Sequence, residues 1–289
     1  MMKFLATRLV WMWTLVIVCH AVVDRTVVAQ DKPNTQVVFY AMGDVPRTPA
    51  EDKLLPRQIE KISNDGEFII HVGDIKSGSM PCNEAVYNKV FAMLGQAKLP
   101  VFMVPGDNEW NDCGDPDQAW KYWKKYFMRF DRLWSHRLPV FRQLEREENF
   151  SFVSGGVLFV GLNLVGGRVQ DAEEWRTRLA QDFQWTQRNL REFGKGVSSF
   201  VLFAHANPNK NHADFFDPFI EEAKAFEKPI LYLHGDGHVW LHDRPFAAKN
   251  ILRVQVVKGG IDPPVKVTVT DAAADPFQFD RRKETIAGN

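Results

Sequence analysis

The sequence has no net charge, little cysteine and no long hydrophobic run beyond its N-terminus. Its 289 residues include 36 Lys and Arg against 36 Asp and Glu. This balance argues against a nucleic-acid or general polyanion binder, because such proteins need a clustered surplus of basic residues. After residue 29 no stretch stays apolar for the roughly 20 residues that a membrane-spanning helix requires. The hydrophobic share of 45% is ordinary and excludes a collagen-like or largely disordered chain.

Two common catalytic motifs are also missing. The sequence has no phosphate-cradling glycine loop of the P-loop type, which argues against that class of nucleotide-binding protein. It has no Gly-x-Ser-x-Gly turn around a nucleophilic serine, so nothing supports a Ser-His-Asp hydrolase. Residues 36–270 contain no linker, repeat or break in composition, and we therefore expect one domain there.

The N-terminus has the pattern of a secretory signal. Lys3 and Arg8 precede an apolar run over residues 9–23, and Val27-Val28-Ala29 provides a cleavage site before Gln30. We therefore predict a signal peptide over residues 1–29 and a secreted or periplasmic protein. The alternative is an uncleaved signal that anchors the chain to the membrane.

Only Cys82 and Cys113 remain after the signal. In an oxidising compartment two cysteines can form one disulfide. Both lie in comparable loops, each following an apolar run, which favours a Cys82–Cys113 bond over two buried free thiols. Metal binding by two isolated thiols is the least favoured interpretation.

Short apolar runs alternate with segments of helical spacing. Continuous runs of this kind suit strands buried on both faces, and their alternation with helices predicts parallel pairing in an α/β fold. We expect a hairpin over residues 149–163, a long helix over 171–193 and a weakly ordered tail over 271–289. The runs read as buried strands are 37–42, 68–72, 101–105, 199–204 and 229–233, and two β-rich segments follow at 251–257 and 265–270.

Each of the five buried strands ends at an acidic residue or a histidine. Parallel strands bring their carboxyl ends to one edge of a sheet, where ligands collect. Several carboxylates crowded there would repel one another, and a bound cation removes that cost. Oxygen and imidazole donors without thiolate indicate Mg, Mn, Fe or Zn. The residues at the strand ends are Asp44, Asp74, Asp107, His205, and Asp236 with His238.

These motifs, in their order, resemble those of the calcineurin-like metallophosphoesterases over residues 36–260. The chain reads Gly-Asp, Gly-Asp, Gly-Asp-Asn-Glu, apolar-His and Gly-Asp-Gly-His. The resemblance implies a four-layer α/β/β/α sandwich of mixed sheets around two divalent metals. It also implies hydrolysis of a phosphomonoester or phosphodiester by a metal-activated hydroxide.

The resemblance assigns a role to each strand-end residue. It implies that Asp44 and His238 bind the first metal, that Asp74 bridges both, and that Asp107 and His205 bind the second. Asp236 stands where the family has a further histidine ligand. Asn108 replaces a histidine that usually assists the leaving group, and Glu109 matches an orienting acidic residue. The motif Gly-Asp-Asn-Glu thus supplies Asp107, Asn108 and Glu109, and the motif Gly-Asp-Gly-His supplies Asp236 and His238.

The chain departs from the family pattern in charge and in one lost ligand. Pro46 stands where the first motif has a histidine, so the first metal is expected to be weak or absent. Four carboxylates bring the filled site close to neutrality and favour Mg, Mn or Fe over Zn. Arg47 and Lys76 either restore positive charge around a phosphate or are solvated loop residues. His212 either replaces the missing acid or is a solvated loop histidine.

These observations lead to two hypotheses of function. The first is an exported, metal-dependent phosphoesterase that acts on a small phosphorylated substrate and does not bind nucleic acid. The second is a catalytically degenerate member of the fold that serves as a metal- or ligand-binding module. Pro46 and Asn108 favour the second hypothesis, whereas the retained Asp44, Asp74 and His205 favour the first.

Overall fold

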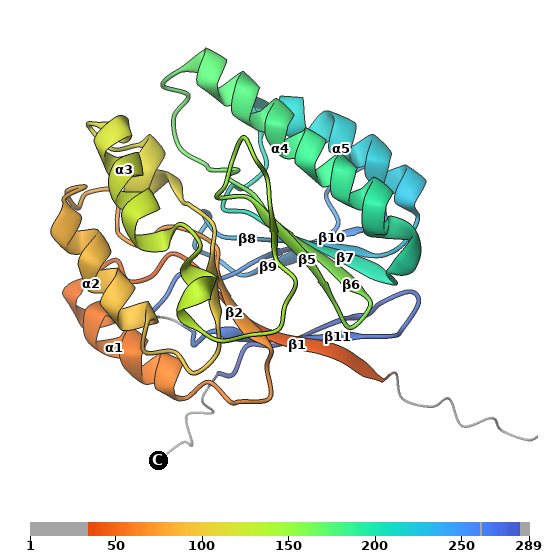
Figure 1. Ribbon diagram of the computed structural model, residues 1–289, viewed down its shortest axis with the longest axis horizontal. Helices are drawn as coiled ribbons and strands as arrows, with labels where there is room; N and C mark the ends of the chain where they lie inside the picture. The colour runs from red at the N-terminus through yellow and green to blue at the C-terminus, as the bar shows by residue number, and fades with distance from the viewer. Residues whose placement is uncertain (1–33, 261, 284–289) are drawn as a thin grey trace, which may run out of the picture. The chain divides into compact units, whose positions relative to one another are not determined.

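The computed structural model describes residues 34–260 and 262–283. The predicted signal peptide lies outside these residues, as does the end of the chain from residue 284. The described residues form two β-sheets that pack face to face, with helices on both outer faces (Figure 1). The strand orders are β12-β11-β1-β2-β3 in one sheet and β4-β5-β6-β7-β8-β10-β9 in the other.

The five-stranded sheet has three parallel strands at its centre and edge. β1 pairs with β2 and β2 with β3 in parallel register, whereas β11 and β12 add antiparallel strands on the other side of β1. Every residue of β2 and β3 is buried, as the continuous apolar runs predict. The bounds are β1 Thr35–Met42, β2 Phe68–His71, β3 Val101–Met103, β11 Val265–Thr270 and β12 Phe277–Asp280.

The seven-stranded sheet has a parallel centre formed by β6, β7, β8 and β10. The predicted hairpin is confirmed as β5 and β6, which turn at Gly155 and Gly156 with φ of 52° and 73°. Two consecutive positive φ angles are those of a tight two-residue hairpin turn, and glycine adopts them without steric cost. The bounds are β4 Phe141–Arg142, β5 Phe150–Ser154, β6 Val157–Gly161, β7 Ser199–Phe203, β8 Ile230–His234, β9 Leu241–Asp243 and β10 Ile251–Gln255.

The helices form the two outer layers. Apolar residues of α1, α2 and α3 pack on the five-stranded sheet, and those of α4 and α5 pack on the seven-stranded sheet. Side chains cap the N-termini of α1 to α4 by accepting backbone N–H bonds within the first turn. The bounds are α1 Pro49–Glu60, α2 Glu84–Leu94, α3 Pro116–Phe127, α4 Ala172–Phe193 and α5 Ala213–Phe226, with shorter turns η1 Asp107–Asn111, η2 Phe130–Leu133, η3 Gly194–Gly196 and η4 Lys210–His212.

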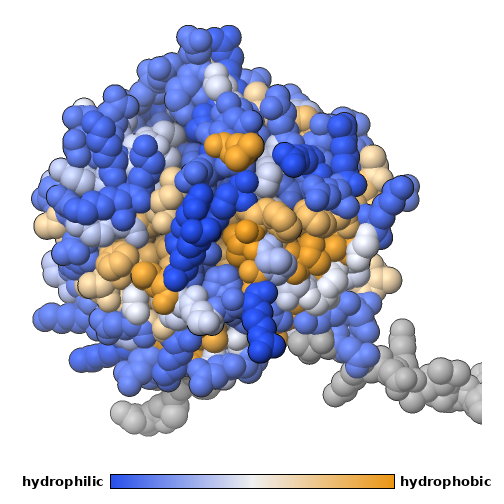
Figure 2. Space-filling view, in the orientation of Figure 1, coloured by the Kyte–Doolittle hydropathy of each residue, from blue (hydrophilic) through white to orange (hydrophobic). Residues whose placement is uncertain are grey.

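A third apolar cluster fills the space between the two sheets. Phe68 of β2 lies at its centre, with ring centroids 5.0 Å from Phe39 and 5.3 Å from Phe159 of the opposite sheet. Outside this core, hydrophilic residues cover most of the helical layers, and apolar residues show in a broken band between them (Figure 2). The predicted four-layer α/β/β/α sandwich is confirmed.

The ordered chain continues past the predicted domain boundary. We expected residues 271–289 to be weakly ordered, but Phe277–Asp280 form β12 and pair with β11 over four register positions. β12 therefore extends the five-stranded sheet beyond residue 270, where we expected the domain to end. Among the described residues, no helix is both long and apolar enough to cross a bilayer.

Candidate metal centre

The predicted ligands lie in five loops that follow parallel strands of both sheets. Asp44 follows β1, Asp74 follows β2, Asp107 begins η1 after β3, and His205 follows β7, while Asp236 and His238 follow β8. Four of these residues have positive φ, with 54° at Asp44, 60° at Asp74, 72° at Asp236 and 63° at His238. Such backbone is uncommon for residues other than glycine and is concentrated at functional sites.

The structure brings five of the six residues into two groups of three. One group is Asp74, Asp107 and His205, all buried, and the other is Asp44, Asp74 and His238. Within each group the possible ligand atoms lie within 4.8 Å of one another. Because Asp74 belongs to both, the arrangement has the geometry of a two-metal centre with a shared carboxylate.

His205 shows that the first of these groups needs a cation. Its Nδ1 lies 2.7 Å from the carbonyl oxygen of Val72, and a carbonyl can only accept, so Nδ1 carries the hydrogen. The neutral ring then has a lone pair at Nε2, which lies 3.0 Å from Asp107 Oδ1 and 3.3 Å from Asp74 Oδ1. Three acceptors that face one another in a buried site require a positive charge between them.

That positive charge is either a proton or a metal ion. Burial lowers the pKa of His205, but the charges of Asp74 and Asp107 outweigh it and raise the pKa well above its ordinary value. Neither Nε2 of His205 nor Oδ1 of Asp107 has a well-aligned hydrogen-bond partner, although both atoms are buried. Two carboxylates and an imidazole with free lone pairs are donors that fit a divalent cation.

Close contact between two glycines lets the ligand loops converge. A Cβ atom on Gly73, whose φ is 87°, would lie 2.7 Å from the Cα atom of Gly106 and 2.7 Å from Nδ1 of His205. A Cβ atom on Gly106 would lie 2.2 Å from the backbone nitrogen of Asp74. No side chain fits at either position, so the Gly-Asp motifs have a steric cause as well as a chemical one.

Glu109 holds the backbone of two ligand loops together. Its Oε1 accepts the backbone N–H groups of Gly106 at 2.6 Å and Asp74 at 3.2 Å. Its own carbonyl accepts the Tyr87 hydroxyl at 2.7 Å. Burial raises the pKa of Glu109. These contacts fix the backbone of the loops that carry Asp74 and Asp107, and an orienting role of Glu109 stays a prediction.

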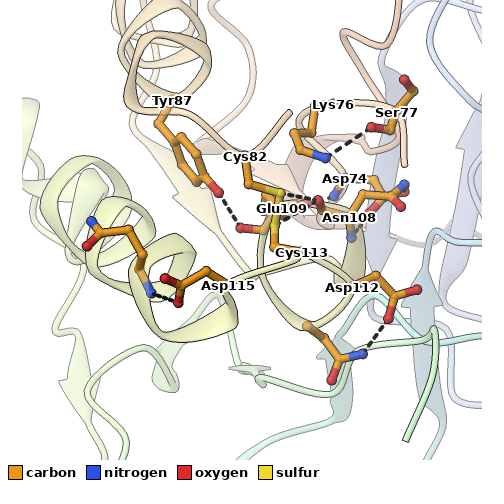
Figure 3. Close-up of a disulfide and its surroundings, with 12 residues drawn as sticks. Asp74, Lys76, Ser77, Cys82, Tyr87, Asn108, Glu109, Asp112, Cys113 and Asp115 are labelled. Carbon is orange, nitrogen blue, oxygen red and sulfur yellow. Dashed lines mark hydrogen bonds between the residues drawn. A yellow bond between two sulfur atoms is a disulfide. The ribbon is translucent and has the colours of Figure 1, made fainter. Parts of the chain in front are cut away.

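Asn108 lies between Asp74 and the disulfide (Figure 3). The Asn108 backbone N–H donates to Asp74 Oδ1 at 3.1 Å, and its side-chain amide donates to Oδ2. The predicted disulfide is confirmed, with Cα atoms of Cys82 and Cys113 6.0 Å apart. Its two sulfur atoms lie 3.6 Å and 3.5 Å from the Asn108 carbonyl oxygen. The bond therefore fastens the loop after β2 to η1.

Two cationic side chains lie at the site, and neither is an ordinary solvated loop residue. Arg47 Nη1 lies 2.7 Å from Asp74 Oδ2 and 3.5 Å from Asp44 Oδ1. Lys76 is only 1% exposed, and its Nζ donates to the Ser77 carbonyl at 3.0 Å. Burial lowers the pKa of Lys76. Both residues place positive charge near the ligands, and a contact of either with phosphate stays a prediction.

Asp236 lies beside the centre but outside both groups. Its Oδ2 accepts the Asn207 backbone N–H at 3.0 Å, and its own N–H donates to Asp44 Oδ2 at 3.2 Å. Burial raises the pKa of Asp236. The backbone of this residue thus orients Asp44, a contribution that the sequence motif did not reveal.

His212 is a core residue, which corrects the prediction that it could contact substrate or replace the missing acid. Its Nε2 donates to the Val165 carbonyl at 2.9 Å, its Nδ1 accepts the Asn209 N–H at 3.3 Å, and its ring packs on Trp175. Both nitrogens are engaged in a fully buried position. His71 of β2 is buried as well.

No protein-family model matches the sequence, and no curated protein matches it as a relative. Similar solved structures do exist. The purple acid phosphatase PPD1 from yellow lupin seeds matches with a TM-score of 0.53 and 10% identity, over 86% of this chain and 53% of the lupin chain. The chain therefore spans about half the length of that enzyme.

Two other solved structures are similar to this chain over most of their own length. GAP50, the anchor in the inner membrane complex of Plasmodium, has a TM-score of 0.46 and 12% identity, over 86% of this chain and 88% of its own. TT1561 of Thermus thermophilus has a TM-score of 0.47 and 14% identity, over 86% and 99%. The likeness to the lupin enzyme is the informative one.

The chain shares its fold with the lupin purple acid phosphatase. In this fold the carboxyl ends of the central strands carry the Asp and His groups described above.

Proposed function

We propose that this chain is a metal-dependent phosphoesterase whose resident cation is held by Asp74, Asp107 and His205. The observation that carries the proposal is the position of His205 Nε2, which faces two buried carboxylate oxygens at 3.0 Å and 3.3 Å. Such a cluster is stable only around a positive charge. The fold supports the same assignment, since these residues lie at the strand ends where it collects ligands.

The oxygen-rich donor set favours Mg, Mn or Fe over Zn, because two carboxylates and one imidazole form a hard site without thiolate. A divalent cation supplies Lewis acidity, which polarises a phosphoryl group and acidifies water. The protein contributes the fixed positions. Glu109 holds the loops of Asp74 and Asp107, and the two backbone N–H bonds to Glu109 keep both carboxylates directed at one point.

The role proposed for Asn108 limits the substrate. Its side-chain amide donates to Asp74, a proposed ligand, and so lies next to the proposed cation. An amide donates hydrogen bonds to a phosphoryl oxygen but transfers no proton near neutral pH. The leaving oxygen must then depart without a protein acid. We therefore propose small phosphate esters with good leaving groups, such as aryl esters, as the preferred class.

An oxidising compartment is the proposed location. The Cys82–Cys113 disulfide supports it, because structural disulfides persist in exported proteins and are rare in reducing compartments. The secretory pattern of residues 1–29 supports the same proposal from sequence.

Hydrolysis of 4-nitrophenyl phosphate and bis(4-nitrophenyl) phosphate tests the proposal. The purified chain is assayed with Mn²⁺, Mg²⁺ or Zn²⁺, beside Asp74→Asn and the control Asp117→Asn, an exposed carboxylate on α3. We expect metal-dependent turnover that Asp117→Asn retains and Asp74→Asn loses. Turnover that is independent of metal, or equal in both variants, would contradict the proposal.

A metal- or ligand-binding module is the second candidate. Arg47 favours it, because the guanidinium that contacts both Asp44 and Asp74 takes up charge that a second metal would otherwise neutralise. In this case the chain binds metal through Asp74, Asp107 and His205, yet hydrolyses neither ester under any metal.

A further inference from the structure

The two groups of ligands differ in their cationic neighbours. Arg47 contacts both carboxylates of the group formed by Asp44, Asp74 and His238. Among the described residues, the only ion-pair partner of Asp107 is His205. Arg47 thus contacts both carboxylates of one group, whereas in the other group it contacts only the shared Asp74.

The contact of Arg47 is well shielded from water. Its side chain is 15% exposed, and those of Asp44 and Asp74 are 0% and 3% exposed. An ion pair in such surroundings is little screened, and guanidinium is the side chain best suited to join two carboxylates in a fixed plane. His238, in contrast, is 38% exposed and is the only imidazole of its group.

The start of α1 holds Arg47 in this position. Thr48 caps the helix by accepting the Glu51 N–H at 3.2 Å, and Glu51 Oε2 accepts the Arg47 backbone N–H at 2.6 Å. The pair resembles a capping box, in which the acidic side chain accepts the N–H of the capping residue. Here Glu51 accepts the N–H of Arg47, the residue before the cap. The backbone from which the guanidinium extends is therefore fixed by the helix terminus.

Pro46 cannot bind a metal ion through its side chain, so it adds no ligand to this group. The residue before Arg47 has no ligating side chain, so a metal ion in this group has only His238 and two carboxylates that Arg47 already contacts. A dication there would also lie next to the guanidinium, and the two positive charges would repel.

We propose that Arg47 is a built-in cation at the first position of the centre, so that the chain binds one divalent ion instead of two. This inference rests on the proposed function, because it assumes that Asp74, Asp107 and His205 hold a metal. One dication and one guanidinium supply three positive charges. They balance the three carboxylates of Asp44, Asp74 and Asp107.

Metal stoichiometry tests the inference without any assay of activity. The full chain and the variant Arg47→Gln are titrated with Mn²⁺ by calorimetry, and metal content is measured after gel filtration. The control is Arg57→Gln, an exposed arginine on α1. We expect one tight equivalent for the wild type and for Arg57→Gln, and a second equivalent for Arg47→Gln.

Thermal unfolding gives a second readout. Without metal, Arg47→Gln should unfold at a lower temperature than the wild type, because Asp44 and Asp74 lose their shared cation. Mn²⁺ should then raise the midpoint of Arg47→Gln more than that of the wild type, as a second ion replaces the lost charge.

The outcomes separate the two proposals. Two tight equivalents in the wild type would overturn the role of Arg47 and leave the proposed function standing, whether or not Arg47→Gln folds. Equal stoichiometry in the wild type and a folded Arg47→Gln would overturn it as well. If neither protein binds metal, both the inference and the proposed function are contradicted.

Discussion

Removal of the Cys82–Cys113 disulfide should weaken both the fold and the candidate metal centre. The bond closes a loop with a sequence separation of 31 residues. In the chain-entropy account, a loop of this length stabilises the folded state by about 3 to 4 kcal/mol at 25 °C. For a domain of this size each kcal/mol corresponds to roughly 2–4 °C in the unfolding midpoint. We therefore expect the double variant Cys82→Ser/Cys113→Ser to melt about 10 °C below the wild type.

The same variant should bind metal less tightly. The disulfide joins the loop after Asp74 to η1, which begins with Asp107, and both sulfur atoms contact the Asn108 carbonyl. Loss of such outer support commonly costs 10–100-fold in metal affinity, and we expect a loss of about 10-fold for Mn²⁺.

Urea unfolding and Mn²⁺ titration measure the two effects. Wild type treated with dithiothreitol is the matched control, because reduction opens the same bond without changing any side chain. It should reproduce the midpoint of the double variant. If the oxidised wild type and the double variant share one midpoint and one affinity, the disulfide neither stabilises the fold nor orders the centre.

Two further predictions concern residues whose surroundings fix the direction of the effect. Burial raises the pKa of Asp182 on α4 from 3.8 to about 7, so the folded state keeps a proton that the unfolded chain loses near pH 4. Stability should fall as the pH rises from about 4 to about 7, by up to about 4 kcal/mol. The variant Asp182→Asn removes this loss of stability. In urea unfolding it should be more stable than the wild type at pH 8 but not at pH 4. An equal difference in stability at both pH values would contradict the raised pKa of Asp182. The variant Gly106→Ala places a Cβ atom 2.2 Å from the Asp74 nitrogen, and it should lose stability and Mn²⁺ affinity. The control Gly114→Ala should lose neither, because a Cβ atom there meets nothing within 4 Å. Identical melting and titration curves for the two variants would refute the steric argument.

The layers and the ligand loops were predictable because their signals are local. The runs that became β2 and β3 are apolar apart from His71, a pattern typical of strands covered on both faces. The Gly-Asp motifs fall where such runs end, and parallel pairing brings those ends together. The hairpin at Gly155-Gly156 is marked by a dipeptide that adopts the positive φ angles of its turn without steric cost.

The contacts that were not predicted depend on partners far away in the chain. His212 looked like a loop residue, but Val165 and Trp175 enclose it from other elements. β12 lacks the continuous apolar run that marked β2 and β3, and its register is set by β11. For Arg47 the sequence left a phosphate contact and a solvated position open, and the contact with Asp74 depends on the folded start of α1.

Anomalous diffraction from crystals of the wild-type chain grown with Mn²⁺ tests the central claim most directly. The account predicts a manganese peak bonded to carboxylate oxygens of Asp74 and Asp107 and to Nε2 of His205. An anomalous map without a peak between these three side chains, at a Mn²⁺ concentration that saturates the titration, would contradict it.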